Sequence, residues 1–250
     1  MHDFSRTSRP KTEDRIPSFR EYTQLQQLAG GRQLIGNGSA TIVSPNGHLI
    51  TAAHVVPKSA KALVLFRKRL FEAKVLSRLE EQDALLLQIK SQKEKFPFAE
   101  IIECDYPLGR SVFSLGFPVP DSLGLRPRFA AAYISSEEGY HGDESRFTIL
   151  TDMAAGTSGS GVFDSDGKVI GIVSASLLAM GRGADQFPDN TCFCVKSQSF
   201  LDDLSKHLPQ VKAIKRQKRD WQEIINSSAS ASVLVLACSA KHGSGQQSKV

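Results

Sequence analysis

Residues 156 to 164 read GTSGSGVFD, and the strand-like run KVIGIVSAS follows at residues 168 to 176. The first stretch is too rich in glycine and serine to be ordinary core, yet it stands directly ahead of a segment typical of a buried strand. A tight glycine turn can aim several backbone N–H groups at one point and leave a serine hydroxyl exposed beside them. The stretch therefore indicates either an activated serine with an oxyanion hole or a plain β-turn between two strands.

The residues on either side of this turn predict the class of fold. Between about residues 36 and 195 short strand-like runs alternate with turns. Examples are SATIVS, HLITAAHVV, ALLLQI, SVFSLGF and TCFCVK, separated by turn signals such as PNG, GFP and DSDG. Segments of strand length at this spacing predict an all-β barrel or sandwich. The segment SFLDDLSKHL has the apolar spacing of a helix and closes this region.

The two ends of the chain differ from this central region. Residues 1 to 32 are polar, with one short helix predicted in SFREYTQLQQLAG. Residues 206 to 219 hold six Lys or Arg and no acid, and without them the formal net charge of +5 becomes 25 − 26 = −1. This basic segment is either a contact for an anionic partner or, more simply, a solvated helix face. Residues 226 to 250 are predicted to form a weakly ordered tail, with an extra strand or a partner-docking segment as the alternative.

Composition argues against a membrane span and a disulfide framework. No apolar run reaches the ~18 residues of a transmembrane helix, and the polar N-terminus MHDFSRTSRPKTEDR does not resemble a secretory signal. Cys104, Cys192, Cys194 and Cys238 have no CxxC spacing, so we expect buried free thiols in a reducing compartment. These features predict a soluble, cytoplasmic protein with no metal site and no cofactor.

A nucleophilic serine needs a base, and the base needs a group that orients it. Five of the six histidines lie in terminal regions, turns or polar loops, whereas His54 ends the apolar, small-residue stretch HLITAAHVV. Asp83 stands immediately before the apolar run ALLLQI. Taken alone, His54 fits a core histidine and Asp83 fits a strand cap. With Ser158 in the glycine turn, however, they give the order His, Asp, Ser within one all-β region.

This combination resembles the trypsin-like serine peptidases, and most of all their HtrA/Deg branch. The resemblance spans about residues 33 to 208 and rests on GNGSATIVSPNGHLITAAHVV, DALLLQI, LGRSVFSLGFPVP and TDMAAGTSGSGVFDSDGKVIGIVSAS. It implies two packed six-stranded Greek-key β-barrels, at about residues 33–100 and 101–196. A closing helix at about 197–208 and a basic, low-complexity tail at 209–250 would follow.

The resemblance also implies roles for these residues. Ser158 would attack the scissile carbonyl, His54 would carry the proton to the leaving amine, and Asp83 would hold the imidazole in place. The backbone N–H groups of Gly156 and Ser158 would form the oxyanion hole. The implied activity is that of a serine endopeptidase, acting through an acyl-enzyme on protein or peptide substrates in quality control or specific processing. The alternative is a catalytically latent module that binds peptides in the same groove.

A strand that accepts the substrate backbone as an added β-strand is implied as well. Its residues are Val173, Ser174, Ala175 and Ser176, with Ser174 beside the buried aspartate. Asp152 lies six residues before Ser158, where trypsin-like enzymes place the acid that selects Lys or Arg. In the HtrA/Deg pattern the same aspartate ends a strand, and residues 153–155 line an apolar pocket for small or aliphatic residues. We favour this second interpretation.

Two departures from these families bear on regulation. Thr157 stands where digestive relatives carry the aspartate that pairs with a new N-terminus after zymogen cleavage, so activation by that ion pair is not expected. The ~40 residues after the closing helix are fewer than the about 50 that a PDZ domain would need. Regulation and assembly through PDZ domains are therefore not expected, and the oligomeric state, monomer or trimer, stays open.

Overall fold

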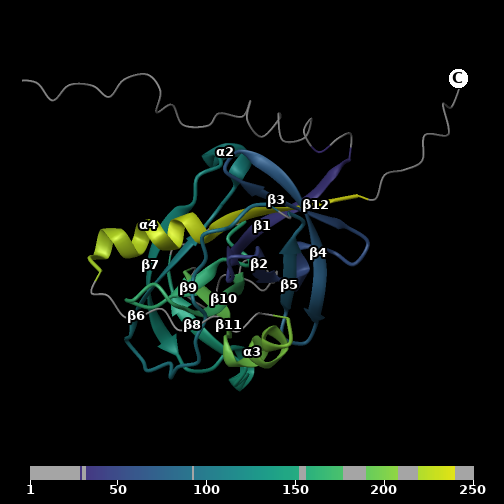
Figure 1. The fold of residues 1–250 in the computed structure, drawn as a ribbon. Helices are drawn as coiled ribbons and strands as arrows, with labels where there is room; N and C mark the ends of the chain where they lie inside the picture. The colour runs from purple at the N-terminus through teal and green to yellow at the C-terminus, as the bar shows by residue number, and fades with distance from the viewer. Residues whose placement is uncertain are drawn as a thin grey trace, which may run out of the picture.

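The computed structural model describes residues 29, 32–91, 93–151, 156–176, 190–207 and 219–239. They form two closed antiparallel barrels of six strands each, which lie side by side (Figure 1). The strands are β1 (Leu34–Ile42), β2 (His48–Ala52), β3 (Lys61–Phe66), β4 (Arg69–Leu79), β5 (Ala84–Ile89), β6 (Ser111–Gly116), β7 (Arg128–Ser136), β8 (Arg146–Leu150), β9 (Gly161–Phe163), β10 (Val169–Ser176), β11 (Thr191–Lys196) and β12 (Ser232–Cys238). This architecture confirms the predicted fold class of two chymotrypsin-like barrels.

The described helical segments are short. They are the 3₁₀ turns η1 (Ala53–Val55) and η2 (Tyr140–Gly142) and the helices α2 (Pro120–Leu123), α3 (Gln198–Ser205) and α4 (Trp221–Ala231). Helix α3 lies within the predicted closing helix and buries Phe200 and Leu204. The helix predicted near the N-terminus lies outside the described residues.

Both barrels follow one strand order, and the comparison exposes an unusual feature. Around the second barrel the order is β6-β7-β8-β11-β10-β9, and around the first it is β12-β1-β2-β5-β4-β3. The two orders match position by position when β12 takes the place that β6 holds in the second barrel. The first strand of the first barrel is therefore supplied by a segment that comes after the whole second barrel in the sequence.

This finding corrects the prediction of a weakly ordered tail, which is wrong for residues 226 to 238. These residues continue α4 and form β12, whose seven residues are all buried. Strand β12 pairs with β1 from Leu34↔Cys238 to Thr41↔Ser232 and with β3 from Leu65↔Leu234 to Lys61↔Cys238. The first barrel is thus not contained in residues 33–100, which supply five of its strands. The alternative prediction for this segment, an extra strand, is confirmed by β12.

Helix α4 fastens this strand to the second barrel. Its N-terminus carries a capping box between Asp220 and Glu223, and Ile224 and Ala231 are buried in the apolar cluster that joins the two barrels. A side chain at Gly167 would collide with Ile224, since a Cβ there would lie 2.9 Å from the Ile224 Cγ2 atom. In Figure 1 the yellow α4 and β12 accordingly run from the side of the second barrel to the first.

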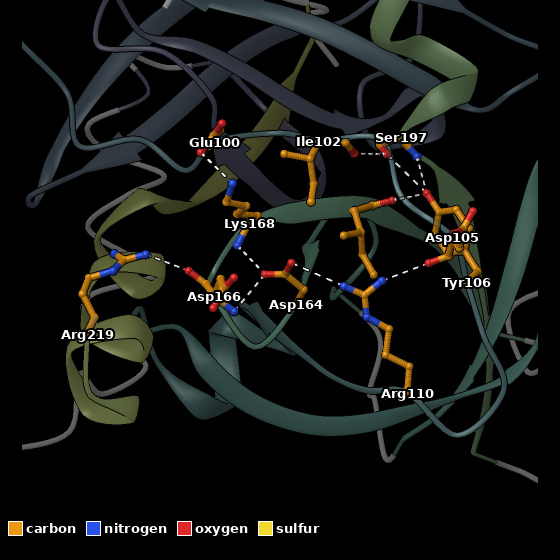
Figure 2. A network of polar contacts seen from close by, with 11 residues as sticks. Glu100, Ile102, Asp105, Tyr106, Arg110, Asp164, Asp166, Lys168, Ser197 and Arg219 are labelled. Atoms are coloured by element: carbon orange, nitrogen blue, oxygen red, sulfur yellow. Dashed lines mark hydrogen bonds and ion pairs between the residues drawn. The ribbon is translucent and has the colours of Figure 1, made fainter. Parts of the chain in front are cut away.

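A polar network holds the turn under α4 (Figure 2). The Asp164 carboxylate accepts hydrogen bonds from the backbone N–H groups of Asp166 and Lys168, at 3.0 and 2.9 Å. Arg219, just ahead of α4, donates to the Asp166 carbonyl at 2.7 Å. Arg219 belongs to the predicted basic segment, so at least one side chain of that segment makes a contact within the protein. Residues 208–218 of that segment lie outside the described residues, and its anionic partner stays a prediction.

Among the described helices none is long and apolar enough to cross a membrane. The described cysteines are free. Cys192, Cys194 and Cys238 are buried, as expected, whereas Cys104 is only partly buried. The cytoplasmic location stays a prediction.

Candidate active site

The turn that carries His54 (residues 53–56, the histidine turn) is positioned by the pairing of two barrel strands. Ala52 at the end of β2 lies opposite Ala84 at the start of β5. The next residues, Ala53 and Asp83, are therefore neighbours, and the Ala53 N–H donates to the Asp83 carbonyl at 3.1 Å. The chain then turns at η1 and projects His54 outward with half of its side chain exposed. The His54 ring consequently lies at the surface while its backbone is fixed to β5.

Arg78 holds this turn from the other side. Its Nη1 donates to the Ala53 carbonyl at 2.9 Å and its Nη2 to the Val56 carbonyl at 2.5 Å. These two carbonyls flank His54 in the sequence. Because a guanidinium is a rigid planar fork, two bonds to the turn fix its orientation as well as its position.

Asp83 is bound to His54 through both backbone and side chain. Its Oδ2 lies 2.8 Å from His54 Nδ1, and its Oδ1 accepts from the His54 backbone N–H at 3.0 Å. Ser174 of the second barrel donates its hydroxyl to Oδ2 at 2.6 Å. Burial alone would raise the pKa of Asp83, but the hydrogen bonds from His54 and Ser174 outweigh it and hold the pKa below its ordinary value. The carboxylate is therefore ionised at neutral pH, and it directs Nε2 of His54 away from itself.

Asp83 also has a left-handed backbone, with φ at 54°. Asp and Asn adopt this conformation more readily than other non-glycine residues, because their short polar side chains can bond locally. In this conformation the Asp83 carbonyl accepts from the Ala53 N–H while the Asp83 carboxylate binds His54.

The turn that carries Ser158 (residues 156–160, the serine turn) packs against β1 and β2 of the first barrel. Gly159 has φ at 84°, and a Cβ there would lie 2.1 Å from Thr51 Oγ1 and 2.2 Å from the Ser39 carbonyl oxygen, so only glycine fits. The Ser39 N–H donates to the Ser158 carbonyl at 2.8 Å. Ser158 is thus held beside the β1–β2 face that leads to His54. Both residues are described, and no hydrogen bond joins the Ser158 hydroxyl to the His54 ring among the described contacts.

The backbone of residues 156 to 158 is anchored at each of its carbonyls. The Gly156 oxygen accepts from Ser39 Oγ at 2.9 Å, and the Thr157 oxygen accepts from both the backbone N–H and the hydroxyl of Ser160. In a trans peptide the N–H points opposite to the preceding carbonyl. Since the Thr157 carbonyl points toward Ser160, the Ser158 N–H points the other way, as a donor to an oxyanion requires.

The predicted substrate strand lies in β10. Its pairing with β11 continues to Ser176, whereas its pairing with β9 covers only Val169 to Ile172. The Val173 N–H and carbonyl are used by Ser160 and Gly159. Among the described residues the edge of β10 that faces away from β11 is therefore unpaired only at residues 174–176, which include Ala175. Asp152 and residues 153–155 lie outside the described residues, so the predicted pocket stays a prediction.

Sequence reasoning missed Ser39 and Arg78, which hold the serine turn and the histidine turn respectively. Ser39 lies in a strand with ordinary alternation, and Arg78 is one basic residue among many. The stretch GNGSATIV does carry a signal, because a serine and a threonine two apart in the buried part of a strand must each find a hydrogen-bond partner.

Two barrels with a His–Asp pair and a serine turn at their junction define the class of chymotrypsin-like proteins. The profile of the trypsin-like peptidase domain matches residues 38–172, more than half of the chain. The chain belongs to this family. The matched segment holds His54, Asp83 and Ser158 but ends before α4 and β12.

Individual relatives agree with this assignment. A protein of Rickettsia prowazekii named as a probable periplasmic serine endoprotease, DegP-like, is 31% identical over 179 residues, covering 67% of this chain and 34% of the relative. The protein y4bJ of Sinorhizobium fredii, named as uncharacterized, is 28% identical over 236 residues, covering 92% of this chain and 36% of the relative. The chain thus spans about a third of the length of these curated relatives.

Solved structures share the fold. The HtrA-type protease AlgW, solved with a decapeptide, superposes with a TM-score of 0.54 at 23% identity, over 68% of this chain and 50% of that one.

Proposed function

We propose that the protein is a serine endopeptidase that hydrolyses peptide bonds through Ser158, His54 and Asp83. The observation that carries this proposal is the bidentate contact of Asp83 with His54, completed by Ser174 from the other barrel. A strand cap needs no bond to a histidine ring, and a core histidine is not half exposed. Peptide binding alone requires none of these contacts.

The proposed reaction assigns one task to each group. The ionised Asp83 carboxylate fixes the His54 tautomer with the proton on Nδ1, which leaves Nε2 free to accept the proton of the Ser158 hydroxyl. The Ser158 oxygen then attacks the scissile carbonyl, and His54 returns the proton to the leaving amine. The oxyanion that develops is stabilised by the N–H groups of Ser158 and Gly156. Water repeats the sequence on the acyl-enzyme and releases the second product.

The open edge of β10 supports a peptide as the substrate. An extended peptide can pair with residues 174–176 as an added strand, which carries its scissile bond toward Ser158. The same observation favours the second candidate, a latent peptide-binding module, because the edge would bind a peptide whether or not Ser158 is reactive. The HtrA-type neighbour, whose structure contains a decapeptide, is consistent with either function.

Labelling with a fluorophosphonate probe distinguishes the two candidates. We expect the folded wild-type protein to be labelled, and Ser158→Ala and heat-denatured protein to remain unlabelled. Cleavage of a peptide library would then show the residue preference before the scissile bond. A folded wild-type protein that binds an extended peptide but is neither labelled nor able to cleave would refute the endopeptidase and leave the binding module.

A further inference from the structure

Ser39 is a buried serine of β1 whose polar groups are all used, and three of its four contacts are made outside the first barrel. Its side chain is fully buried. Within the barrel its carbonyl accepts from Thr51 Oγ1 at 2.7 Å. Its N–H donates to the Ser158 carbonyl at 2.8 Å, and its hydroxyl donates to the Gly156 carbonyl at 2.9 Å. The same hydroxyl accepts from the Phe117 N–H at 2.9 Å.

These bonds fall on both sides of the proposed nucleophile. Ser39 holds the peptide plane that follows Gly156 and the plane that follows Ser158, and Ser160 holds the plane between them. Each bound carbonyl fixes the N–H of the residue that follows it, so the N–H groups of Thr157, Ser158 and Gly159 have little freedom to rotate. Preorganised donors of this kind lose their effect when they must reorient during the reaction.

The position of Ser39 is itself set by its neighbours. It lies opposite Leu234 of β12 in the barrel sheet. On its other side, a Cβ at Gly116 would lie 3.0 Å from the Ser39 hydroxyl, so a larger group has no room there. The hydroxyl is therefore confined between the two barrels, at a place where it meets both the serine turn and the Phe117 N–H.

We infer that Ser39 is a positioning residue that holds the backbone on both sides of the Ser158 N–H, one of the two proposed oxyanion donors, and so sets the rate of the chemical step. This inference rests on the proposed endopeptidase function. It assigns to the first barrel a direct hold on the turn that carries Ser158, beyond its supply of His54 and Asp83. Substrate pairing at β10 does not involve Ser39, so loss of its hydroxyl changes turnover and not substrate binding.

Thr41 provides a matched control on the same strand. It is also fully buried, and its hydroxyl also reaches the second barrel, where it accepts from the Gly161 N–H at 3.0 Å. Gly161 begins β9 and lies beyond the serine turn. Thr41→Val therefore removes a buried contact between the barrels without touching residues 156 to 158.

The test compares Ser39→Ala with Thr41→Val in the full chain, at a temperature where thermal unfolding shows both variants folded. We expect Ser39→Ala to lower kcat about 10-fold or more with KM changed less than about twofold, because a displaced oxyanion donor weakens binding of the transition state only. Thr41→Val should keep both constants within about twofold of wild type. Equal effects of the two substitutions, or a change in KM alone, would overturn the inference.

Amide hydrogen exchange tests the same contact without turnover. Ser39→Ala leaves the Phe117 N–H without its partner, so its exchange should become faster in this variant and not in Thr41→Val. Unchanged exchange at Phe117 would reject the positioning role even where the wild type cuts no substrate. Faster exchange in a protein that is neither labelled nor active would instead show that Ser39 makes this backbone contact and would reject the endopeptidase, and with it the effect on the chemical step.

Discussion

Leu234→Ala tests whether the C-terminal strand is part of the folded barrel. The Leu234 side chain is fully buried in a cluster with Leu63, Leu65 and Phe117. Its backbone pairs with Ser39 of β1 and Leu65 of β3. The substitution removes three carbon atoms from the side chain and leaves a cavity between the strand and the connection that follows β6.

The size of the effect follows from burial. Leu→Ala in a close-packed core costs about 2–5 kcal/mol of unfolding free energy. The same change in a solvated tail stays within about 0.5 kcal/mol. With a urea slope of about 3 kcal/mol/M for a chain of this size, a loss of about 3 kcal/mol moves the unfolding midpoint by about 1 M.

Urea unfolding followed by circular dichroism measures this shift. Leu108→Ala is the matched control, since Leu108 is 66% exposed and the substitution removes the same atoms. Its midpoint should stay within about 0.2 M of wild type, given the small cost of surface substitutions. If Leu234→Ala unfolded at the same urea concentration as Leu108→Ala, the placement of β12 in the barrel would be refuted.

Four further outcomes are expected. Asp83→Asn should lower kcat by about three orders of magnitude or more in a peptide-hydrolysis assay while the protein stays folded, because asparagine tolerates the left-handed backbone but loses the charge that orients His54. In the folded state the pKa of Asp83 lies below its ordinary value of 3.8. The contribution of the ionised carboxylate to stability is therefore present above pH 3.8 and is lost as the pH falls through the folded pKa. The difference in unfolding free energy between wild type and Asp83→Asn should shrink at acid pH, and a difference that grew would contradict the contacts described. Arg78→Met should lower the melting temperature and kcat together, since it frees both carbonyls around His54, whereas unchanged kinetics would show that the turn holds itself. Burial raises the pKa of the Cys192 thiol to about 11, so mass spectrometry should find it alkylated at pH 8 only after unfolding, and rapid alkylation of the native protein would be inconsistent with its burial.

The central part of the fold could be predicted because its signals are local. Strands such as ALLLQI can be recognised by their length and composition. His54 lies just after such a strand, and Asp83 and Ser158 lie just before one. For Ser174 the sequence predicts only a place beside the aspartate and no particular contact. Its hydrogen bond to Asp83 crosses between the barrels, so it becomes visible only when β10 is placed beside Asp83.

Strand β12 could not be placed from the sequence for a different reason. The run VLVLAC is apolar, but it stands among serines and alanines, and no local pattern says which sheet a strand joins. Its place depends on β1 and β3, whose facing edges are left unpaired when the first barrel receives only five strands from its own region. Ser39 could not be singled out either, because its partners outside the first barrel lie 78 to 119 residues away along the chain. The oligomeric state and the anionic partner stay predictions.

The placement of β12 also sets the order in which the protein can be made. The strands that present His54 and Asp83 are synthesised first, yet their barrel cannot close until residues 232 to 238 have left the ribosome. At about 5–20 residues per second, the wait between Ile89 and Ser232 is roughly 7 to 30 seconds. During that time the second barrel can fold while the first stays open. We therefore expect the proposed catalytic site to assemble only in a chain that has been synthesised through β12.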